Sequence, residues 1–292
     1  MRTNTGERLF VAVAYGMIAV LAIACFIPFL IVIAGSFTSE TELLLNGYGL
    51  FVKAYSFEAY RLLAQSAVIY RSFGISIAVT GLGTALALSV TSALAYSIAS
   101  KKNLMRNGLA FYVYFTMLFN GGVVPFYILV SGWLQLRDTI WALILPSSVN
   151  PFFVIIAVAY FRRLPDELAE CGRIDGASEW IIFLRLILPI SIPIMAVIAL
   201  FYGLAFWNDW FMPLLFIQNE ALFPLQLLLH RIIGNPSNAG SILAPGMLSG
   251  ASYPGMQLQM AMLVLTVCPI ILVYPLVQRY FIHGITISAI KR

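Results

Sequence analysis

Long apolar runs separated by short charged segments make up most of the chain. A transmembrane helix needs about 20 mainly apolar residues to cross the hydrocarbon layer. Backbone groups inside a bilayer must be satisfied internally, so runs of this length are expected to be helices. Barrel strands would be shorter and would alternate apolar with polar residues. We predict about six transmembrane helices, at residues 10–35, 72–99, 108–131, 139–161, 187–217 and 257–282.

The first apolar run, residues 10–35, also invites a reading as a secretory signal. A signal peptide has an apolar core of about 7–15 residues, and this run is about twice as long. The stretch from Ala22 to Cys25 weakly resembles a lipoprotein cleavage site. We expect the run to be retained as a spanning helix.

The composition agrees with a membrane protein of one domain. Of the 292 residues, 61% are hydrophobic and 10% are charged, which is too little polar surface for a soluble domain of this length. The net charge of +5 lies in short clusters between apolar runs, so we relate it to membrane orientation rather than to nucleic acid. Nothing resembles a soluble linker, so residues 1–292 are predicted to form a single transmembrane domain.

The positive residues predict the orientation, because cytoplasmic loops carry an excess of Lys and Arg. With both termini in the cytoplasm, twelve of the seventeen Lys and Arg residues fall on the cytoplasmic side. We therefore expect a multi-pass protein of the bacterial cytoplasmic (inner) membrane with both ends inside the cell.

No enzyme motif is present in the sequence. It contains no Gly-x-x-x-x-Gly-Lys-[Ser/Thr] phosphate loop, no Gly-x-Ser-x-Gly elbow and no His-Glu-x-x-His zinc motif. Its three cysteines have no metal-ligand spacing. We predict no catalytic residue, no metal and no cofactor on this chain.

A charged segment between the fourth and fifth predicted spans carries the most information. Residues 162–185 contain nine of the twenty-nine charged residues. Pro165 suits a first helical turn, Gly176 is placed to end that helix, and Ser178 can cap a second helix that ends before Pro189. Taken on its own, the segment can equally be a solvated loop between two spans. The apolar side chains available to face a partner are Leu168, Ile174, Trp180 and Ile181.

The same segment resembles a known motif. The stretch Glu170-Cys-Gly-Arg-Ile-Asp-Gly-Ala, followed by Ile187-Leu-Pro, is similar to the EAA motif of binding-protein-dependent ABC importers, which lies between the fourth and fifth spans of a six-span permease. The resemblance implies a coupling helix that docks on an ATPase subunit. Cys171 and Gly172 replace the two alanines of the motif. The implied coupling residues are Glu170, Arg173, Asp175, Gly176 and Ala177.

Two further stretches resemble the MalG-type, carbohydrate-importing branch of that family, namely Phe206-Trp-Asn-Asp-Trp and the tail Gly284–Arg292. The stretch from Phe119 to Tyr127 is similar to a subgroup that imports oligosaccharides from polysaccharides of the alginate and pectin type. The resemblance implies the all-α transmembrane domain of a type I ABC importer. Its partners would be a second permease subunit, two ATPase subunits that bind ATP and Mg²⁺, an extracytoplasmic sugar-binding protein and membrane lipid. The loop 234–255 would reach into the docked binding protein.

Polar and aromatic residues in the spans are candidates for a sugar path, because a polar side chain in a membrane usually faces a bundle interior or a water-filled path. A sugar needs hydrogen bonds and apolar ring faces. The alternative is that the aromatic residues are interfacial anchors and the asparagines join helices. The candidates are Asn120, Tyr127, Asn150, Trp207, Asn208 and Asp209.

An ion-coupled secondary carrier of small polar solutes is the main alternative function. It predicts ionisable residues in the middle of the membrane and internal inverted repeats. Neither is clear in this sequence. The permease of an ABC importer therefore remains the leading prediction.

Overall fold

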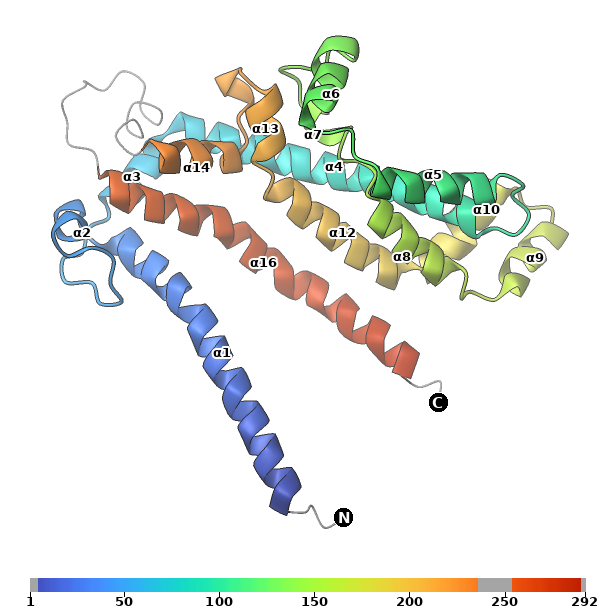
Figure 1. Cartoon of the computed structure of the whole chain (residues 1–292), viewed down its shortest axis with the longest axis horizontal. Helices are drawn as coiled ribbons and strands as arrows, with labels where there is room; N and C mark the ends of the chain where they lie inside the picture. Colours follow the sequence, from blue (N-terminus) through green and yellow to red (C-terminus); the bar gives the residue numbers. More distant parts are fainter. Residues whose placement is uncertain (1–4, 236–253, 290–292) are drawn as a thin grey trace. The chain divides into compact units, whose positions relative to one another are not determined.

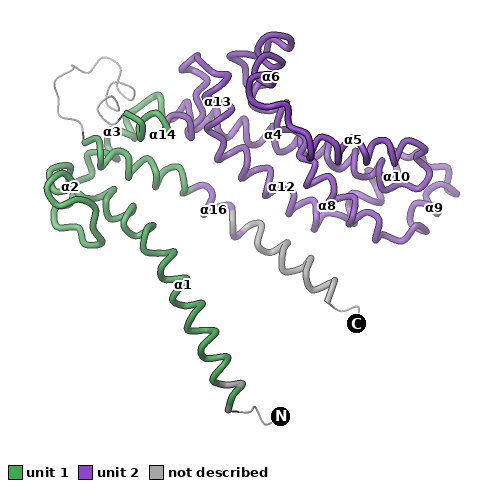
Figure 2. The backbone as a smooth tube through the Cα atoms, viewed as in Figure 1, with its two compact units in different colours: residues 1–69, 229–268 green, residues 70–228, 269–292 purple. Residues whose placement is uncertain are grey.

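The structure, a computed structural model, describes residues 5–235 and 254–289 (Figure 1). Within these residues the regular structure is helical, and the one strand-like pairing is an isolated antiparallel bridge between Thr38 and Tyr55. The chain divides into two compact units, residues 1–69 with 229–268 and residues 70–228 with 269–292 (Figure 2). The predicted all-α fold class is confirmed.

The first unit begins with a long apolar helix near the N-terminus. Helix α1 spans Thr5–Phe37 and is followed by α2 at Glu40–Asn46 and α3 at Glu58–Gln65. Helices α14 (Leu225–Gly234) and α16 (Gly255–Ala289) each run from one unit into the other. Residues 9–37 of α1 are long and apolar enough to cross a membrane, and their side chains are almost entirely exposed, as a lipid-facing helix requires.

Hydrogen bonds join three elements of the first unit. The Glu40 carboxylate accepts from the backbone N–H of Met256 (3.0 Å) and of Gln257 (2.9 Å) at the start of α16. The Gln257 side-chain amide donates to the carbonyls of Ser36 (3.2 Å) and Ser56 (2.6 Å). A carboxylate at a helix N-terminus satisfies orphan N–H groups and meets the positive end of the helix dipole. These contacts hold the ends of α1 and α16 beside the start of α2.

The second unit is built around α4, α5, α8 and α12. Its elements, in chain order, are α4 (Ala67–Ala99, whose first three residues belong to the first unit), α5 (Arg106–Leu118), α6 (Val123–Tyr127) with a π-helical turn (Ile128–Trp133), α7 (Trp141–Ile144), α8 (Pro151–Phe161), α9 (Asp166–Ile174), α10 (Glu179–Ile182) with a π-helical turn (Phe183–Ile187), α11 (Leu188–Ile190), α12 (Ile192–Trp207), α13 (Phe211–Phe216) and a 3₁₀ turn (Glu220–Leu222).

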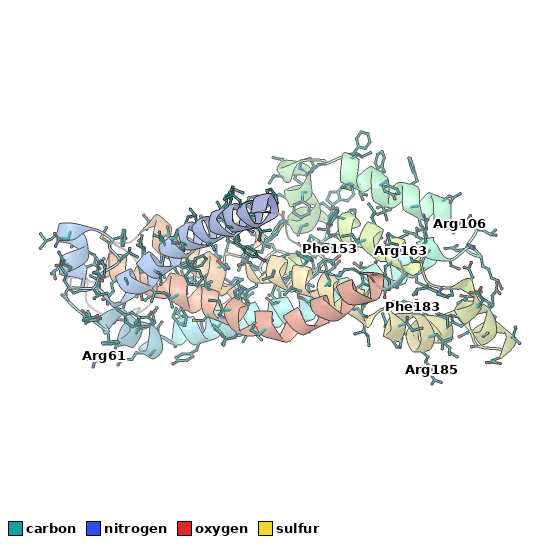
Figure 3. All side chains as sticks on the ribbon, turned by 90° about the horizontal axis from the view of Figure 1, so that it is seen from below. Arg61, Arg106, Phe153, Arg163, Phe183 and Arg185 are labelled. Carbon is teal, nitrogen blue, oxygen red and sulfur yellow. The ribbon has the colours of Figure 1, made fainter. Side chains whose placement is uncertain are left out.

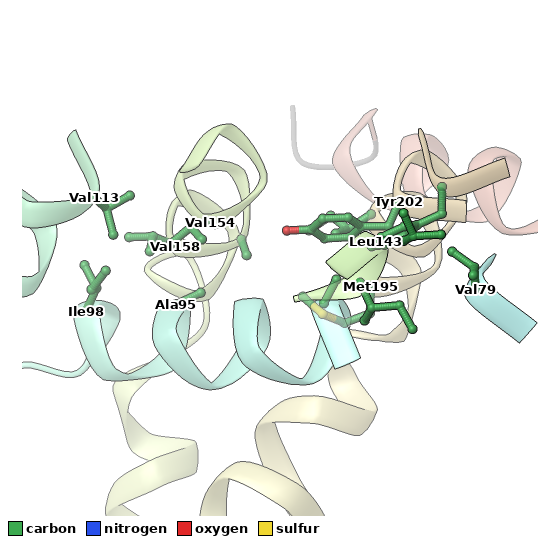
Figure 4. Close-up of a cluster of buried hydrophobic side chains, with 14 of the residues drawn as sticks. Val79, Ala95, Ile98, Val113, Leu143, Val154, Val158, Met195 and Tyr202 are labelled. Atoms are coloured by element: carbon green, nitrogen blue, oxygen red, sulfur yellow. The ribbon is translucent and has the colours of Figure 1, made fainter. Parts of the chain in front are cut away.

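Small and branched side chains form the core of this unit (Figure 4). Ala95 of α4 and Val154 of α8 are fully buried, together with Ile198 of α12. At Gly83 of α4, an added Cβ would lie 2.9 Å from ring atoms of Phe206 on α12. Real Cβ atoms do not come this close, so glycine lets these two helices approach each other.

Three predicted spans are broken, which differs from the continuous helices expected. The chain bends by 119° between the helices of residues 106–118 and 123–133, and by 84° between those of 179–190 and 192–207. The first break contains Gly122 at φ +85°, a conformation that favours glycine. The predicted span 139–161 is broken between α7 and α8. Pro151 begins α8, and a proline disfavours helical geometry in the residue before it.

These breaks affect the number of spans. Three described helices are long and apolar enough to cross a membrane, and the number rises to five if each bent pair is one span. The remaining predicted span, residues 139–161, contains the shorter apolar helix Pro151–Phe161.

Candidate coupling surface and translocation pathway

Helix α9 and the turn after it have the geometry that the sequence predicts. Pro165 precedes the first turn, where Asp166 and Glu167 meet the positive end of the helix dipole. At the other end Gly176 has φ +78°, its N–H donates to Arg173 O (3.0 Å), and the Ala177 N–H donates to Gly172 O (2.9 Å). This pair of bonds is a Schellman motif. The prediction that Gly176 ends the helix is confirmed.

The second helix is longer than predicted. It begins after Ser178, whose side chain makes no capping bond, and it continues through the π-helical turn into α11, which contains Pro189. The prediction that it ends before Pro189 is wrong. A proline inside a helix removes one intrahelical hydrogen bond and crowds the carbonyl four residues earlier. Arg185, four residues before Pro189, lies in the π-helical turn.

Gly172 allows α9 to pack closely against α10 and the π-helical turn. It is buried, and a Cβ at this position would lie 3.0 Å from Ile182 Cγ1 and 3.1 Å from Leu186 Cδ1. Glycine in place of the motif's alanine at position 172 therefore lets the two helices lie closer together. Its cost is about 1 kcal/mol of helix propensity relative to Ala.

An ion pair fixes α9 to α10 and to α4. Arg173 Nε donates to Glu179 Oε1 (2.8 Å), and the Tyr96 hydroxyl of α4 donates to Glu179 Oε2 (2.7 Å). The hydrogen bond from Arg173, followed by that from Tyr96, holds the pKa of the Glu179 carboxyl below its ordinary value. A second pair joins Lys101 to Asp166. Sequence reasoning missed Glu179 and Tyr96, because their contact joins residues that are 83 positions apart.

Three of the four apolar side chains that the sequence marks as available to a partner are exposed on this element. The side chain of Ile174 is 84% exposed and that of Trp180 is 65% exposed; Ile181 is also exposed, whereas Leu168 is half-buried. Figure 1 shows α9 and α10 together at one end of the second unit, and Figure 3 places Arg106, Arg163 and Arg185 at the same end.

The predicted coupling residues take different positions on this element. Glu170 is exposed on α9 and lines a cleft of about 200 Å³ with Lys101, Lys102 and Arg173. Asp175 is the C-cap of α9, and Ala177 packs against the core.

A second pocket lies at the far end of α12. It has a volume of about 420 Å³ and brings together Asn150, Asn208 and Asp209 with Ser147 and Tyr202. Three of the six residues predicted for the sugar path therefore meet in one pocket.

Hydrogen bonds within the chain already use part of each of these side chains. Asp209 Oδ1 accepts from the N–H of Phe211 (3.0 Å) and of Met212 (3.1 Å), where α13 begins. Asn150 Oδ1 accepts from Phe152 N–H (3.0 Å) and so caps α8, and Asn208 Oδ1 accepts from the Gln226 amide (3.2 Å). The Asp209 and Asn150 contacts satisfy backbone N–H groups that would otherwise be unpaired at helix starts. The second Asp209 oxygen and the Asn150 amide nitrogen make no hydrogen bond to the described residues.

Tyr202 of α12, which the sequence analysis did not select for the path, organises this pocket. Its phenol is buried, its hydroxyl bonds Thr91 Oγ1 of α4 (2.7 Å), and it accepts from Asn150 N–H (2.9 Å). A buried Tyr hydroxyl needs a hydrogen-bond partner, so a tyrosine inside an apolar run was the available signal.

The other three predicted residues lie outside this pocket. Asn120 Oδ1 accepts from Gly122 N–H (2.8 Å) in the turn between α5 and α6. The Tyr127 ring stacks on Phe216 with centroids 5.7 Å apart. Trp207 is buried and meets Phe73 edge-on at 5.8 Å. In this structure, the rings of Tyr127 and Trp207 pack against other rings of the chain.

Two predicted elements fall partly outside the described residues. Of the loop 234–255, residues 236–253 are not described, and the same holds for residues 290–292 of the tail. Among the described residues, no group of three or more His, Cys, Asp and Glu side chains is arranged to hold a metal ion.

Comparison with known proteins shows the family to which the chain belongs. Residues 85–287 match the model of the family "Binding-protein-dependent transport system inner membrane component". The chain belongs to this family. It is therefore a multi-pass membrane permease subunit of a binding-protein-dependent ABC importer and not an enzyme, as the sequence predicted.

Individual relatives and a solved structure agree with this assignment. The chain is 36% identical over 285 residues to the polygalacturonan/rhamnogalacturonan transport system permease protein YtcP of Bacillus subtilis (strain 168), covering 98% of this chain and 99% of the relative. It is 40% identical over 267 residues to the protein LplC of the same organism, covering 91% of this chain and 89% of LplC. A chain from the crystal structure of a bacterial ABC transporter involved in the import of the acidic polysaccharide alginate matches with a TM-score of 0.85 and 26% identity, over 96% of this chain and 99% of that chain. The predicted type I importer fold is confirmed.

Proposed function

We propose that this chain forms one half of a pore that imports oligosaccharides released from complex polysaccharides. A second permease subunit forms the other half, two separate ATPase subunits hydrolyse ATP with Mg²⁺, and an extracytoplasmic binding protein delivers the sugar. The observation that carries this proposal is the α9–α10 element, two helices joined by the Arg173–Glu179 ion pair that expose Ile174 and Trp180. The relatives that transport polygalacturonan, rhamnogalacturonan and alginate support the substrate class.

The α9–α10 element is the docking surface for an ATPase subunit. Ile174 and Trp180 expose apolar area that a partner would remove from water. Glu170, Arg173, Asp175, Gly176 and Ala177 shape this surface: Gly176 makes the turn, Arg173 fixes it through Glu179, and Glu170 faces outward. In this arrangement both chain termini lie in the cytoplasm.

A connected set of contacts leads from this surface to the pocket. A displacement of α9 reaches α4 through Arg173, Glu179 and Tyr96. On the same helix α4, Thr91 bonds Tyr202, and Tyr202 in turn holds the N–H of Asn150. We assign these contacts as the route by which movement at the ATPase changes the pocket.

The pocket at the end of α12 is the sugar-contacting part of the path in this chain. The amide nitrogen of Asn150 can donate to sugar hydroxyls and the second oxygen of Asp209 can accept from them, and the Asn208 amide nitrogen adds further donors. Phe153 and Phe206 line the same pocket and supply apolar surface for ring faces. Asn120, Tyr127 and Trp207 would take part only if the pore rearranges around α6 and α12.

The test is reconstitution of the chain with its neighbouring permease, ATPase and binding protein in liposomes. Uptake of oligogalacturonides and ATP hydrolysis are measured together, with a neutral oligosaccharide of the same length for comparison. We expect uptake only when ATP and the binding protein are both present, and hydrolysis stimulated by the loaded binding protein. Uptake driven by an ion gradient without ATP would instead support a secondary carrier.

A further inference from the structure

The segment that joins α1 to α3, residues 38–57, carries an exposed apolar surface. Leu45 is 82% exposed and Phe51 is 88% exposed, and Leu44, Leu50 and Tyr55 are exposed as well. Large side chains in such a density on one short segment mark a contact with an apolar medium or with a partner.

The segment is folded, so these side chains are held in position. Thr38 and Tyr55 form the antiparallel bridge, Ser39 N–H donates to Ala54 O (2.9 Å), and Ser56 N–H donates to Phe37 O (2.8 Å). The chain therefore leaves the end of α1 and returns to it within 18 residues, from 38 to 55.

This closure keeps the segment beside the end of α1. Residues 9–37 of α1 form a candidate span, and the bridge lies directly after it. The side chains of Phe29, Leu30 and Ile33 on the last turns of α1 are themselves exposed, as lipid-facing side chains are. The segment, with its own exposed apolar side chains, follows this candidate span after a short buried stretch, Ala34 to Ser36.

The neighbouring helix α3 exposes polar and charged side chains instead. It is about as long as α2, buries Ala59 and Leu63, and exposes Glu58, Arg61 and Gln65. Helix α2 buries Leu43 and exposes Leu44 and Leu45. The two helices belong to the same unit but expose different kinds of side chain. We take this to mean that α2 and α3 face different surroundings outside the protein.

We propose that residues 38–57 form an interfacial element that inserts Leu44, Leu45 and Phe51 into the lipid beside the end of α1. Tyr48 and Tyr55 would then lie at headgroup level, where aromatic side chains with a polar end are favoured. The element also carries Glu40, which holds the first N–H groups of α16. The lipid surface therefore anchors the junction of α1 and α16. This inference does not depend on the substrate of the importer.

Site-directed spin labels test the proposal in the assembled transporter in nanodiscs. Single cysteines replace Leu45 or Phe51 in a chain whose own cysteines, Cys25, Cys171 and Cys268, have been changed to serine. Matched labels replace Lys53, which is exposed on the same segment, and Arg61, which is exposed on α3. Collision with oxygen, which concentrates in lipid, is compared with collision with a water-soluble nickel chelate.

We expect the labels at 45 and 51 to favour oxygen and those at 53 and 61 to favour the nickel chelate, with or without the binding protein. Equal nickel access at 45, 51 and 61 would overturn the proposal. Protection from both reagents would also overturn it: protection that requires the binding protein would assign the surface to that protein, and protection without it would assign the surface to another subunit. Transport by each labelled complex shows separately whether the importer is functional.

Discussion

The coupling surface and the pocket at the end of α12 use polar side chains in opposite ways. On the coupling surface Arg173, Glu179 and Tyr96 bind one another, and apolar side chains are left exposed. In the pocket Asn150 and Asp209 bind backbone N–H groups where helices begin.

The difference follows from the solvent. Water can satisfy backbone groups at the membrane surface, so side chains there are free to pair with each other. Inside a bilayer, a break in a helix leaves N–H groups that only the protein can satisfy. A polar side chain in a predicted span therefore first satisfies backbone groups of the protein. Only its remaining polar atoms can contact a substrate in the path.

The largest effect is expected from Asp209→Leu, because it leaves the N–H groups of Phe211 and Met212 without an acceptor. Each unsatisfied buried group costs about 1–3 kcal/mol. We expect less assembled complex in gel filtration and a lower melting temperature.

Asp209→Asn is the matched control, since an asparagine can cap the helix without the charge. We expect it to keep assembly and to lower sugar uptake. Normal uptake with Asp209→Asn would remove the Asp209 charge from the path and leave only the cap.

Tyr202→Phe separates the two regions by removing one oxygen atom. The ring stays in place, but the N–H of Asn150 and the Thr91 hydroxyl lose their partner. The cost is about 1–3 kcal/mol. We expect basal ATP hydrolysis to remain and its stimulation by the loaded binding protein to fall. Unchanged stimulation would disconnect Tyr202 from the coupling route.

Gly176→Val changes the coupling surface through strain alone. A Cβ at Gly176 meets nothing within 4 Å, but φ is +78°. The left-handed conformation costs a residue with a Cβ about 1–2 kcal/mol. We expect stimulated ATP hydrolysis to fall severalfold in Gly176→Val and to be largely kept in Gly176→Asn, because asparagine tolerates this conformation. Equal losses in both variants would show that the position needs glycine for another reason.

The Arg173–Glu179 pair should contribute less to stability, because the Glu179 side chain is 51% exposed. Exposed ion pairs are worth about 0.2–1 kcal/mol. The lowered pKa of Glu179 means that this contribution is present above the ordinary pKa of Glu and is lost only as the pH falls through the lowered value. A double-mutant cycle with Arg173→Gln and Glu179→Gln at neutral pH measures it. A coupling energy of zero would assign the position of α9 to apolar packing alone.

Gly172→Ala should have the smallest effect, since two contributions oppose each other. Alanine gains about 1 kcal/mol of helix propensity, but its Cβ would press on Ile182 and Leu186 at 3.0 and 3.1 Å. We expect the melting temperature of the complex to change little. Gly172→Leu, which gains propensity but adds volume, should lower it clearly. A stabilised Gly172→Leu complex would contradict the close packing.

Several features could be predicted from the sequence because they depend on neighbouring residues. The end of α9 at Gly176 follows from a local backbone conformation, and the acids at its start follow from the helix dipole. The helix breaks were harder to predict, although Gly122 and Pro151 lie at two of them. An apolar run has the same composition whether its helix is straight or bent by 119°.

The sequence by itself determined that this protein resides in a membrane, that its fold is all-α, and to which family it belongs. Apolar run length, charge distribution and the Glu170–Ala177 motif are properties of consecutive residues. The tertiary structure decided which polar side chains meet. Thr91 bonds Tyr202 across 111 positions, and Tyr96 bonds Glu179 across 83. Such contacts depend on how closely the helices approach each other. Gly83 and Gly172 allow a close approach because they have no side chain. The pocket residues and the coupling route could therefore be identified only once the helices were packed.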